Sequence, residues 1–136
     1  MIFDLLLQEF PVYGAMTLFV FGSIMGSFIH CMGYRVAVGM SLRYPPSQCG
    51  SCKRTLKAID LIPVVSYIIF RGKCRKCSAH FSVIYVVIEV LAGAGYVAIY
   101  WVLKNFTWAS ITVAFWWLAL FAFSFLLHKK IAIQQE

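Results

Sequence analysis

Charged residues are scarce in this chain of 136 residues. Only 12% of the residues are Asp, Glu, Lys or Arg, whereas 62% are hydrophobic and 17% are aromatic. A soluble domain is usually about 45–50% apolar and about 25% charged. The shortage of charge excludes an ordinary soluble domain and indicates an integral membrane protein. At this length we expect a single domain over residues 1–136.

Acidic residues are scarcer than basic ones, at five against twelve, which gives a net charge of +7. A basic chain can bind nucleic acid, but this sequence has no folded basic module that would carry such binding. In so apolar a sequence, Lys and Arg more commonly mark the membrane face that they flank. We therefore expect a lipid bilayer around the chain and no nucleic-acid partner.

Three long segments are almost free of charge. Residues 12–34 and 107–127 contain no charged residue, and residues 83–103 contain only Glu89. Because a helix needs roughly 20 apolar residues to cross the hydrocarbon core, the pattern predicts an all-α fold with about three transmembrane helices. The first segment is expected to be a retained helix rather than a signal peptide, since Asp4 and Glu9 precede it instead of basic residues.

The basic residues indicate an orientation. Nine of the twelve Lys and Arg lie within residues 35–76, and Lys129 and Lys130 follow the third apolar segment. Cytoplasmic loops of membrane proteins carry an excess of such residues. We therefore predict that the N-terminus lies outside and that the 35–82 loop and the C-terminus lie in the cytoplasm.

The 35–82 loop contains two Cys-x-x-Cys pairs. The four candidate metal ligands are Cys49, Cys52, Cys74 and Cys77. Their spacing suits a tetrahedral zinc site of the ribbon type, although iron–sulfur ligation or disulfides are alternatives. Thiols stay reduced in the cytosol, which disfavours disulfides. Four cysteines leave no position open for water, so we expect a structural zinc rather than a catalytic one.

Two further features of the sequence each allow two interpretations. The apolar run over residues 61–70 is too short to span a membrane, and Pro63 would break a helix that enters it. It is expected to lie in the membrane interface or to pack on the helix ends. Glu89 is a weak catalytic candidate because a carboxylate inside a membrane is costly. Its structural alternative is a pairing with Arg35 or Arg71.

The first apolar segment carries small and polar residues. Gly22 and Gly26 form a Gly-x-x-x-Gly step, which lets two helices approach closely. We expect it to pack within the chain rather than onto a second copy. His30 and Cys31 are expected to be packed helix positions rather than additional metal ligands.

Several motifs resemble one protein family in order and in spacing. They are "GSFIHCMGYR" (26–35), "YPPSQCGSC" (44–52), "DLIPVVSYIIFRGKCRKC" (60–77) and "FSVIYVVIEVLAGAGY" (81–96). Together they resemble the N-terminal part of the prepilin peptidases, the type IV leader peptidases. The resemblance implies a bacterial cytoplasmic membrane protein that processes and N-methylates prepilin-like substrates, with S-adenosylmethionine as methyl donor. Such substrates serve pili, type II secretion or competence.

The sequence also departs from that family. The family's peptidase uses two aspartates, one of them in a Gly-x-Gly-Asp motif, whereas this chain contains only Asp4 and Asp60 and no such motif. His128 lies in the region where the first catalytic aspartate would be expected, and His30 stands where the family often has Asn. We therefore expect the peptidase domain to be absent and no prepilin cleavage by this chain alone.

Three interpretations follow from these departures. The chain is a prepilin-processing domain that needs a separate peptidase half, a non-enzymatic scaffold whose zinc ribbon docks a partner, or a decayed or split remnant. Neither retained methyltransferase activity nor the oligomeric state follows from the sequence.

Overall fold

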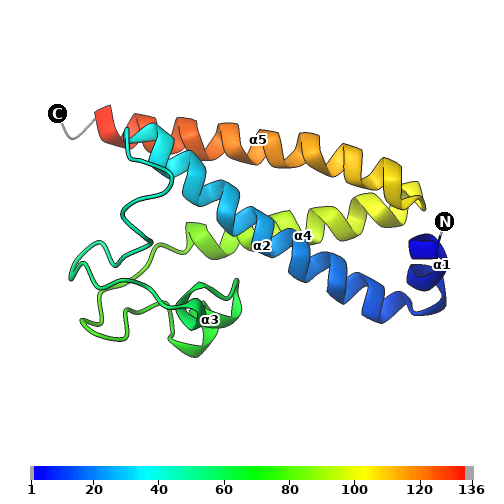
Figure 1. Cartoon of the computed structure of the whole chain (residues 1–136), viewed down its shortest axis with the longest axis horizontal. Coiled ribbons are helices and arrows are strands. Elements are labelled where there is room, and N and C mark those ends of the chain that lie inside the picture. The colour runs from blue at the N-terminus through cyan, green and yellow to red at the C-terminus, as the bar shows by residue number, and fades with distance from the viewer. Residues whose placement is uncertain (1, 134–136) are drawn as a thin grey trace.

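The computed structural model describes residues 2–133, which form a helical bundle with an irregular loop beside it (Figure 1). The elements in chain order are α1 (Ile2–Glu9), α2 (Pro11–Ala37), the 3-10 helix η1 (Ala58–Leu61), α3 (Val65–Ile69), α4 (Ile84–Leu103) and α5 (Phe106–Ile133). Strand-like pairing in the described residues is limited to two isolated bridges in the loop. The all-α fold is therefore confirmed.

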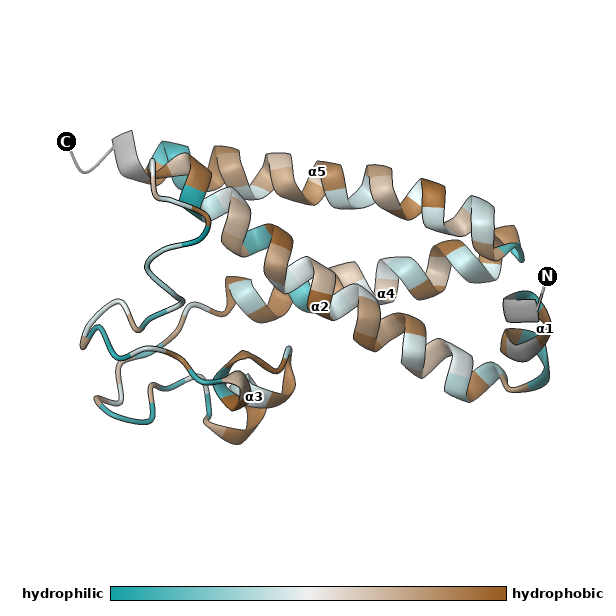
Figure 2. Cartoon of the chain, in the orientation of Figure 1, coloured by the Kyte–Doolittle hydropathy of each residue, from teal (hydrophilic) through white to brown (hydrophobic). Residues whose placement is uncertain are grey.

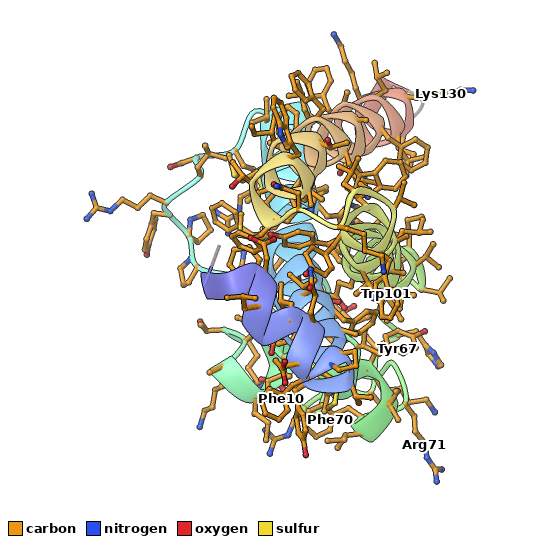
Figure 3. The ribbon with its side chains drawn as sticks, turned by 90° about the vertical axis from the view of Figure 1, so that its right-hand side faces the viewer. Phe10, Tyr67, Phe70, Arg71, Trp101 and Lys130 are labelled. Atoms are coloured by element: carbon orange, nitrogen blue, oxygen red, sulfur yellow. The ribbon has the colours of Figure 1, made fainter. Side chains whose placement is uncertain are left out.

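Three of the helices, α2, α4 and α5, are long and apolar enough to cross a membrane. Hydrophobic residues run along the whole length of all three (Figure 2). Seen from the end of the bundle, side chains such as Trp101 project outward from the helices (Figure 3), and Trp101 is 48% exposed. An apolar outer surface of this extent is that of a multi-pass membrane protein.

Helices α2 and α4 cross at the predicted small-residue step. A Cβ atom added to Gly22 would lie 2.9 Å from both the Ala92 carbonyl oxygen and the Gly93 Cα. Only glycine allows this approach, because any side chain would push the two backbones apart. The prediction that the Gly-x-x-x-Gly step packs within the chain is confirmed.

Helices α2 and α5 are joined by a buried polar contact. The Ser124 hydroxyl lies 2.8 Å from His30 Nδ1 and 3.2 Å from the His30 carbonyl oxygen. The rings of Tyr85 and His128 lie 4.8 and 5.2 Å from the His30 ring, and His30 is only 1% exposed. His30 is thus a packed helix position, as the sequence predicts.

The two ends of the bundle carry different structures. Helix α1 and the short turn between α4 and α5 lie at one end, and the cysteine loop and the end of α5 lie towards the other (Figure 1). Asp4 Oδ1 accepts a 2.7 Å hydrogen bond from the Phe106 N–H, which caps the start of α5. Helix α1 was not predicted, because eight residues are too few to reveal a helical pattern.

Candidate metal centre

Each Cys-x-x-Cys pair folds into the same tight knuckle. In the first, the Cys49 N–H donates to the Arg54 carbonyl at 2.9 Å, and the Lys53 N–H donates to the Cys49 carbonyl at 3.0 Å. The second knuckle, residues 74–79, repeats both bonds at the same spacing and at 2.9 Å each. The equivalent residues Lys53 and Ser78 have φ of 57° and 58°. Two matching knuckles face each other and present paired sulfurs.

The four sulfur atoms lie at the spacing of a tetrahedral metal site. All four lie within 4.8 Å of one another. Cys49 and Cys77 Sγ are 3.7 Å apart, and Cys52 and Cys74 Sγ are 3.9 Å apart. A tetrahedron of sulfurs about 2.3 Å from zinc has edges of about 3.8 Å, whereas a disulfide would need about 2.05 Å. The cysteines are therefore free thiols that can hold a metal ion such as zinc.

Backbone groups prepare two of the thiols, those of Cys49 and Cys74, for ionisation. The N–H groups of Cys52 and Ser51 lower the pKa of the Cys49 thiol. In the second knuckle, the N–H groups three and two positions further on lower the pKa of Cys74 to about 6. Cys77 differs: one backbone N–H lowers its pKa, but burial and the three neighbouring sulfurs raise it to about 11. A bound dication would relieve the repulsion between the thiolates, which fits a metal site.

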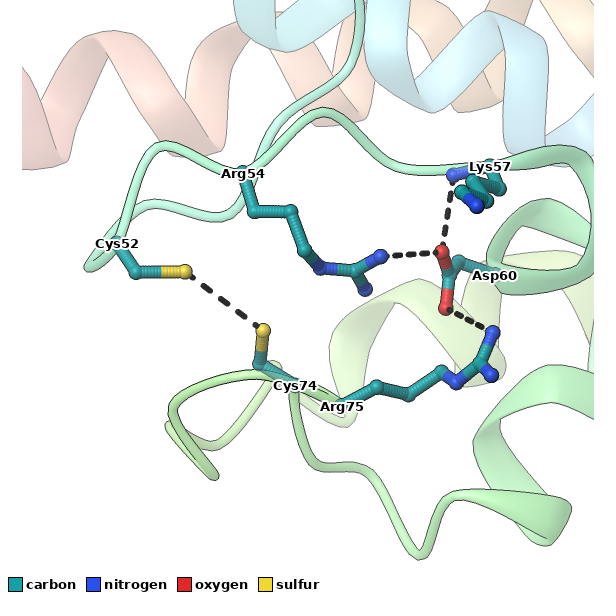
Figure 4. Close-up of polar contacts among 6 residues, drawn as sticks. All are labelled: Cys52, Arg54, Lys57, Asp60, Cys74 and Arg75. Atoms are coloured by element: carbon teal, nitrogen blue, oxygen red, sulfur yellow. Dashed lines mark hydrogen bonds and ion pairs between the residues drawn. The ribbon is translucent and has the colours of Figure 1, made fainter.

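Asp60 connects the two knuckles through charged contacts (Figure 4). Its Oδ2 atom accepts a 2.9 Å bond from the Lys57 N–H and lies 3.2 Å from Arg54 Nη1, and its Oδ1 atom lies 3.9 Å from Arg75 Nη1. Burial raises the pKa of Asp60, but Arg54, the Lys57 N–H and Arg75 together lower it below the usual value. Asp60 first, and then the Cys74 sulfur, raise the pKa of the Arg54 guanidinium, which Figure 4 shows between them.

Glu89 is buried, at 8% exposure, and its contact corrects the sequence-based prediction. Its Oε2 atom accepts a 2.8 Å hydrogen bond from the Val64 N–H. Within residues 2–133 it forms no ion pair with Arg35 or Arg71, so the predicted partners are wrong. Arg35 instead donates to two loop carbonyls at 2.7 Å each. Pro63 has no N–H, and the turn after it directs the next N–H at α4; sequence spacing could not reveal that direction.

A cavity of about 140 Å³ separates the loop from α2 and α4. Its lining includes the carboxylates of Asp60 and Glu89, the ammonium of Lys73, the rings of Tyr67 and Tyr85, and Ser27 and Cys31 of α2. Cys31 lies outside the group of four ligands, as the sequence predicts, and it lines this cavity, which the sequence did not predict. The contacts of Asp60 with Arg54 and Arg75 were not predicted, because no motif marks them and only the folded loop brings them together.

Comparison with known proteins identifies relatives of this chain. The sequence model of the bacterial peptidase A24 N-terminal domain matches residues 20–103, which include the four cysteines and Glu89. No solved structure matches the chain.

Three curated relatives illustrate the similarity. The prepilin leader peptidase/N-methyltransferase of Bacillus subtilis (strain 168) is 37% identical over 81 residues, covering 60% of this chain and 33% of the relative. The protein of the same name from Myxococcus xanthus (strain DK1622) is 35% identical over 94 residues, covering 69% and 27%. The type 4 prepilin-like proteins leader peptide-processing enzyme of Escherichia coli O78:H11 is 26% identical over 139 residues, covering 88% and 51%. The chain thus spans 27–51% of the length of these relatives.

Proposed function

The chain belongs to the bacterial peptidase A24 N-terminal domain family, and on that premise we propose that it takes part in processing and N-methylating type IV pilin-like precursors. The observation that carries this proposal is the family match over residues 20–103. The proposed reaction is taken from the name of the relatives, prepilin leader peptidase/N-methyltransferase. The substrates would serve pili, type II secretion or competence.

The four-cysteine loop is proposed to hold one structural zinc. Cys49, Cys52, Cys74 and Cys77 would be its ligands, and the sulfur spacings of 3.7 and 3.9 Å support a tetrahedral site. Bound zinc would neutralise the thiolates and fix the two knuckles relative to each other. No ligand position would stay open for water, so the ion would take no direct part in catalysis.

The aspartates for peptide cleavage are proposed to come from outside these 136 residues. An aspartyl dyad requires two carboxyl groups about 3 Å apart that share one proton. Asp4 lies in α1 at one end of the bundle, and Asp60 lies in the loop beside the other (Figure 1). Glu89, the acid in α4, already accepts a hydrogen bond from Val64. These positions of the acidic residues support the proposal that the chain by itself does not cleave prepilins.

The cleavage test reconstitutes the chain in liposomes with a prepilin. We expect no shortened product from the chain alone, and a product only when a partner polypeptide supplies the catalytic aspartates. Cleavage by the chain that survives Asp60→Asn and Glu89→Gln would contradict the proposed source of the carboxylates. Cleavage abolished by Glu89→Gln would instead identify Glu89 as a catalytic acid.

The proposed orientation has the N-terminus outside and the cysteine loop in the cytoplasm of a bacterial cell. The basic residues support it. With three spans, the basic residues of the loop lie on the same side of the membrane as Lys129 and Lys130. A membrane-impermeant thiol reagent applied to intact cells after chelation should leave the four cysteines unlabelled. Labelling of these cysteines from outside would reverse the orientation.

For the methylation step, we propose that S-adenosylmethionine binds in the cavity between the loop and the helices. The carboxylates of Asp60 and Glu89 and the rings of Tyr67 and Tyr85 line this cavity. Carboxylates and aromatic faces attract a sulfonium cation. Calorimetry should detect binding of S-adenosylmethionine to the wild type and weaker binding to Tyr85→Ala. Equal binding to both would argue against this location.

The scaffold alternative makes a different prediction. If the cysteine loop only docks a partner, the chain would bind that partner without increasing methylation of any prepilin. Methyl transfer from labelled S-adenosylmethionine to a pre-cleaved pilin, measured with and without the chain, separates the two functions.

A further inference from the structure

We propose that residues 59–69 form a re-entrant anchor, a segment that dips into the loop-side leaflet and contacts lipid directly. Its occupant would be an anionic phospholipid bilayer, with acyl chains against its apolar side chains and headgroups against the basic residues at its ends. Apart from Asp60, whose carboxylate contacts Arg54 and Arg75, the segment is separate from the metal centre. The segment would lie in lipid whether or not the chain processes prepilins.

The anchor exposes an unusual set of apolar side chains. The exposed fractions are 45% for Ile59, Leu61, Ile62 and Val65, 67% for Ile68 and 60% for Ile69. In water such a cluster would be unfavourable, and contiguous apolar patches mark membrane or protein contacts. The segment lies beside the bundle, and hydrophobic colours predominate in it as they do in the spans (Figure 2).

A hydrogen bond fixes the depth of the anchor. Val64 binds the Glu89 carboxylate, and Glu89 is five residues beyond Ile84, the first residue of α4. At 1.5 Å per residue, this contact lies about 8 Å along α4 from its start. The hydrocarbon core is about 30 Å thick, so the segment reaches into its loop-side half. Figure 1 agrees, because α3 lies alongside the bundle and not beyond its end.

Backbone N–H groups of the anchor are hydrogen-bonded within the protein, as a membrane environment requires. Non-helical backbone enters a membrane only where its polar groups are satisfied by the protein. Pro63 has no N–H, the Val64 N–H is bound by Glu89, and three N–H groups of α3 and its end bind carbonyls four residues earlier at 3.0–3.1 Å. Val64 has φ of 60°, an unfavourable value for a β-branched residue. Glu89 is therefore a positioning residue that holds a strained turn against α4.

Basic residues flank the anchor on the side of the metal centre. Lys57 precedes it, Arg71 and Lys73 follow it, and all three are exposed. Figure 3 shows the Arg71 side chain pointing away from the bundle. Apolar residues bordered by Lys and Arg are typical of segments that lie at the surface of an anionic leaflet. Charge complementarity thus favours anionic lipid over a protein partner.

The test places a photo-crosslinking amino acid, p-benzoylphenylalanine, in the full chain in phosphatidylglycerol liposomes. One variant carries it at Ile68 and a matched control at Lys76, which is also exposed but lies in the second knuckle. Mass spectrometry should find lipid adducts at least tenfold more often at position 68. Equal yields at both positions, or crosslinks at position 68 only to a second copy of the chain, would overturn the anchor.

A second set of variants tests the role of Glu89. With the crosslinker at position 68, Glu89→Ala should lower the lipid adducts severalfold, whereas Glu89→Gln should retain them because its amide oxygen still accepts the Val64 N–H. Val90→Ala, at the next position of α4, is the control and should retain them. Unchanged adducts in Glu89→Ala, or equal loss in Glu89→Gln and Val90→Ala, would overturn this role. A catalytic carboxylate would be inactivated by Gln as well, so the pattern separates positioning from catalysis.

Discussion

The helix bundle and the four-cysteine loop are held together by different interactions. In the bundle, α2 approaches α4 through glycine, and buried apolar residues such as Ile88 and Val113 are only 1% exposed. Among the described loop residues, the only buried hydrophobic ones are Cys49 and Cys74, at 1% and 2% exposure. A segment without an apolar core needs another source of stability. The bundle is therefore stabilised by close packing, and the loop by its metal ligands and charged contacts.

Loss of a cysteine ligand should have the largest effect. Cys49→Ser or Cys74→Ser should reduce the zinc content from about one per chain to nearly none and unfold the loop, because apparent zinc binding of about 10–16 kcal/mol in small sites is folding free energy. Elemental analysis of detergent-purified protein measures the content. Cys31→Ser is the matched control and should keep its zinc. A metal-free wild type with two disulfides would refute the site, and iron in place of zinc would correct its identity.

A change at the α2–α4 crossing should affect the bundle alone. An added Cβ at Gly26 would contact Ala92 and lie 3.3 Å from the Ile88 carbonyl, so Gly26→Ala should destabilise the bundle by about 1–3 kcal/mol. Unfolding in sodium dodecyl sulfate, followed by circular dichroism, gives this value. Gly50→Ala is the control, because nothing lies within 4 Å of its added Cβ. Loss of zinc in Gly26→Ala would show that the two regions are not independent.

Removal of the charge that links the knuckles should have a moderate effect on the loop. Asp60→Asn weakens the contacts with Arg54 and Arg75, worth about 1 kcal/mol for partly exposed pairs. Zinc transfer to a chelator should become about fivefold faster. Asp4→Asn, at the other end of the bundle, should leave the transfer rate unchanged. An unchanged rate in Asp60→Asn would mean that Asp60 does not support the metal centre.

The smallest effect is expected at the α2–α5 contact. Ser124→Ala removes the hydroxyl that binds His30, and interhelical hydrogen bonds in membranes contribute about 0.6 kcal/mol on average. The same detergent unfolding measures it. Thr112→Ala removes a hydroxyl that binds only the carbonyl of its own helix, and serves as control. A loss above about 2 kcal/mol would make polar contacts, rather than packing, the main stabilising interaction of the bundle.

Features that depend on short stretches of the chain could be predicted from the sequence. The spans follow from uncharged segments of sufficient length, because a bilayer requires about 20 apolar residues per helix whatever their neighbours are. The four ligands follow from their spacing, because a Cys-x-x-Cys knuckle is a local structure. The packing role of Gly22 and Gly26 could also be predicted, since small residues four apart lie on one face of a helix.

Contacts that depend on the path of the loop could not be predicted. The sequence suggested Arg35 or Arg71 for Glu89, because opposite charges are the default partners of a buried acid. The actual partner is a backbone N–H, which becomes available through the turn at Pro63 and Val64. The salt bridge from Arg54 to Asp60 likewise needs the knuckle to be folded.

Amide hydrogen exchange with and without zinc tests most directly the claim that metal holds the loop and packing holds the bundle. The N–H groups of Lys53 and Ser78 close the two knuckles and serve as reporters for the loop. We expect chelation to abolish their protection while the amides of α4 keep theirs. Persistent protection of both reporters in zinc-free protein, or a parallel loss in α4, would contradict the account.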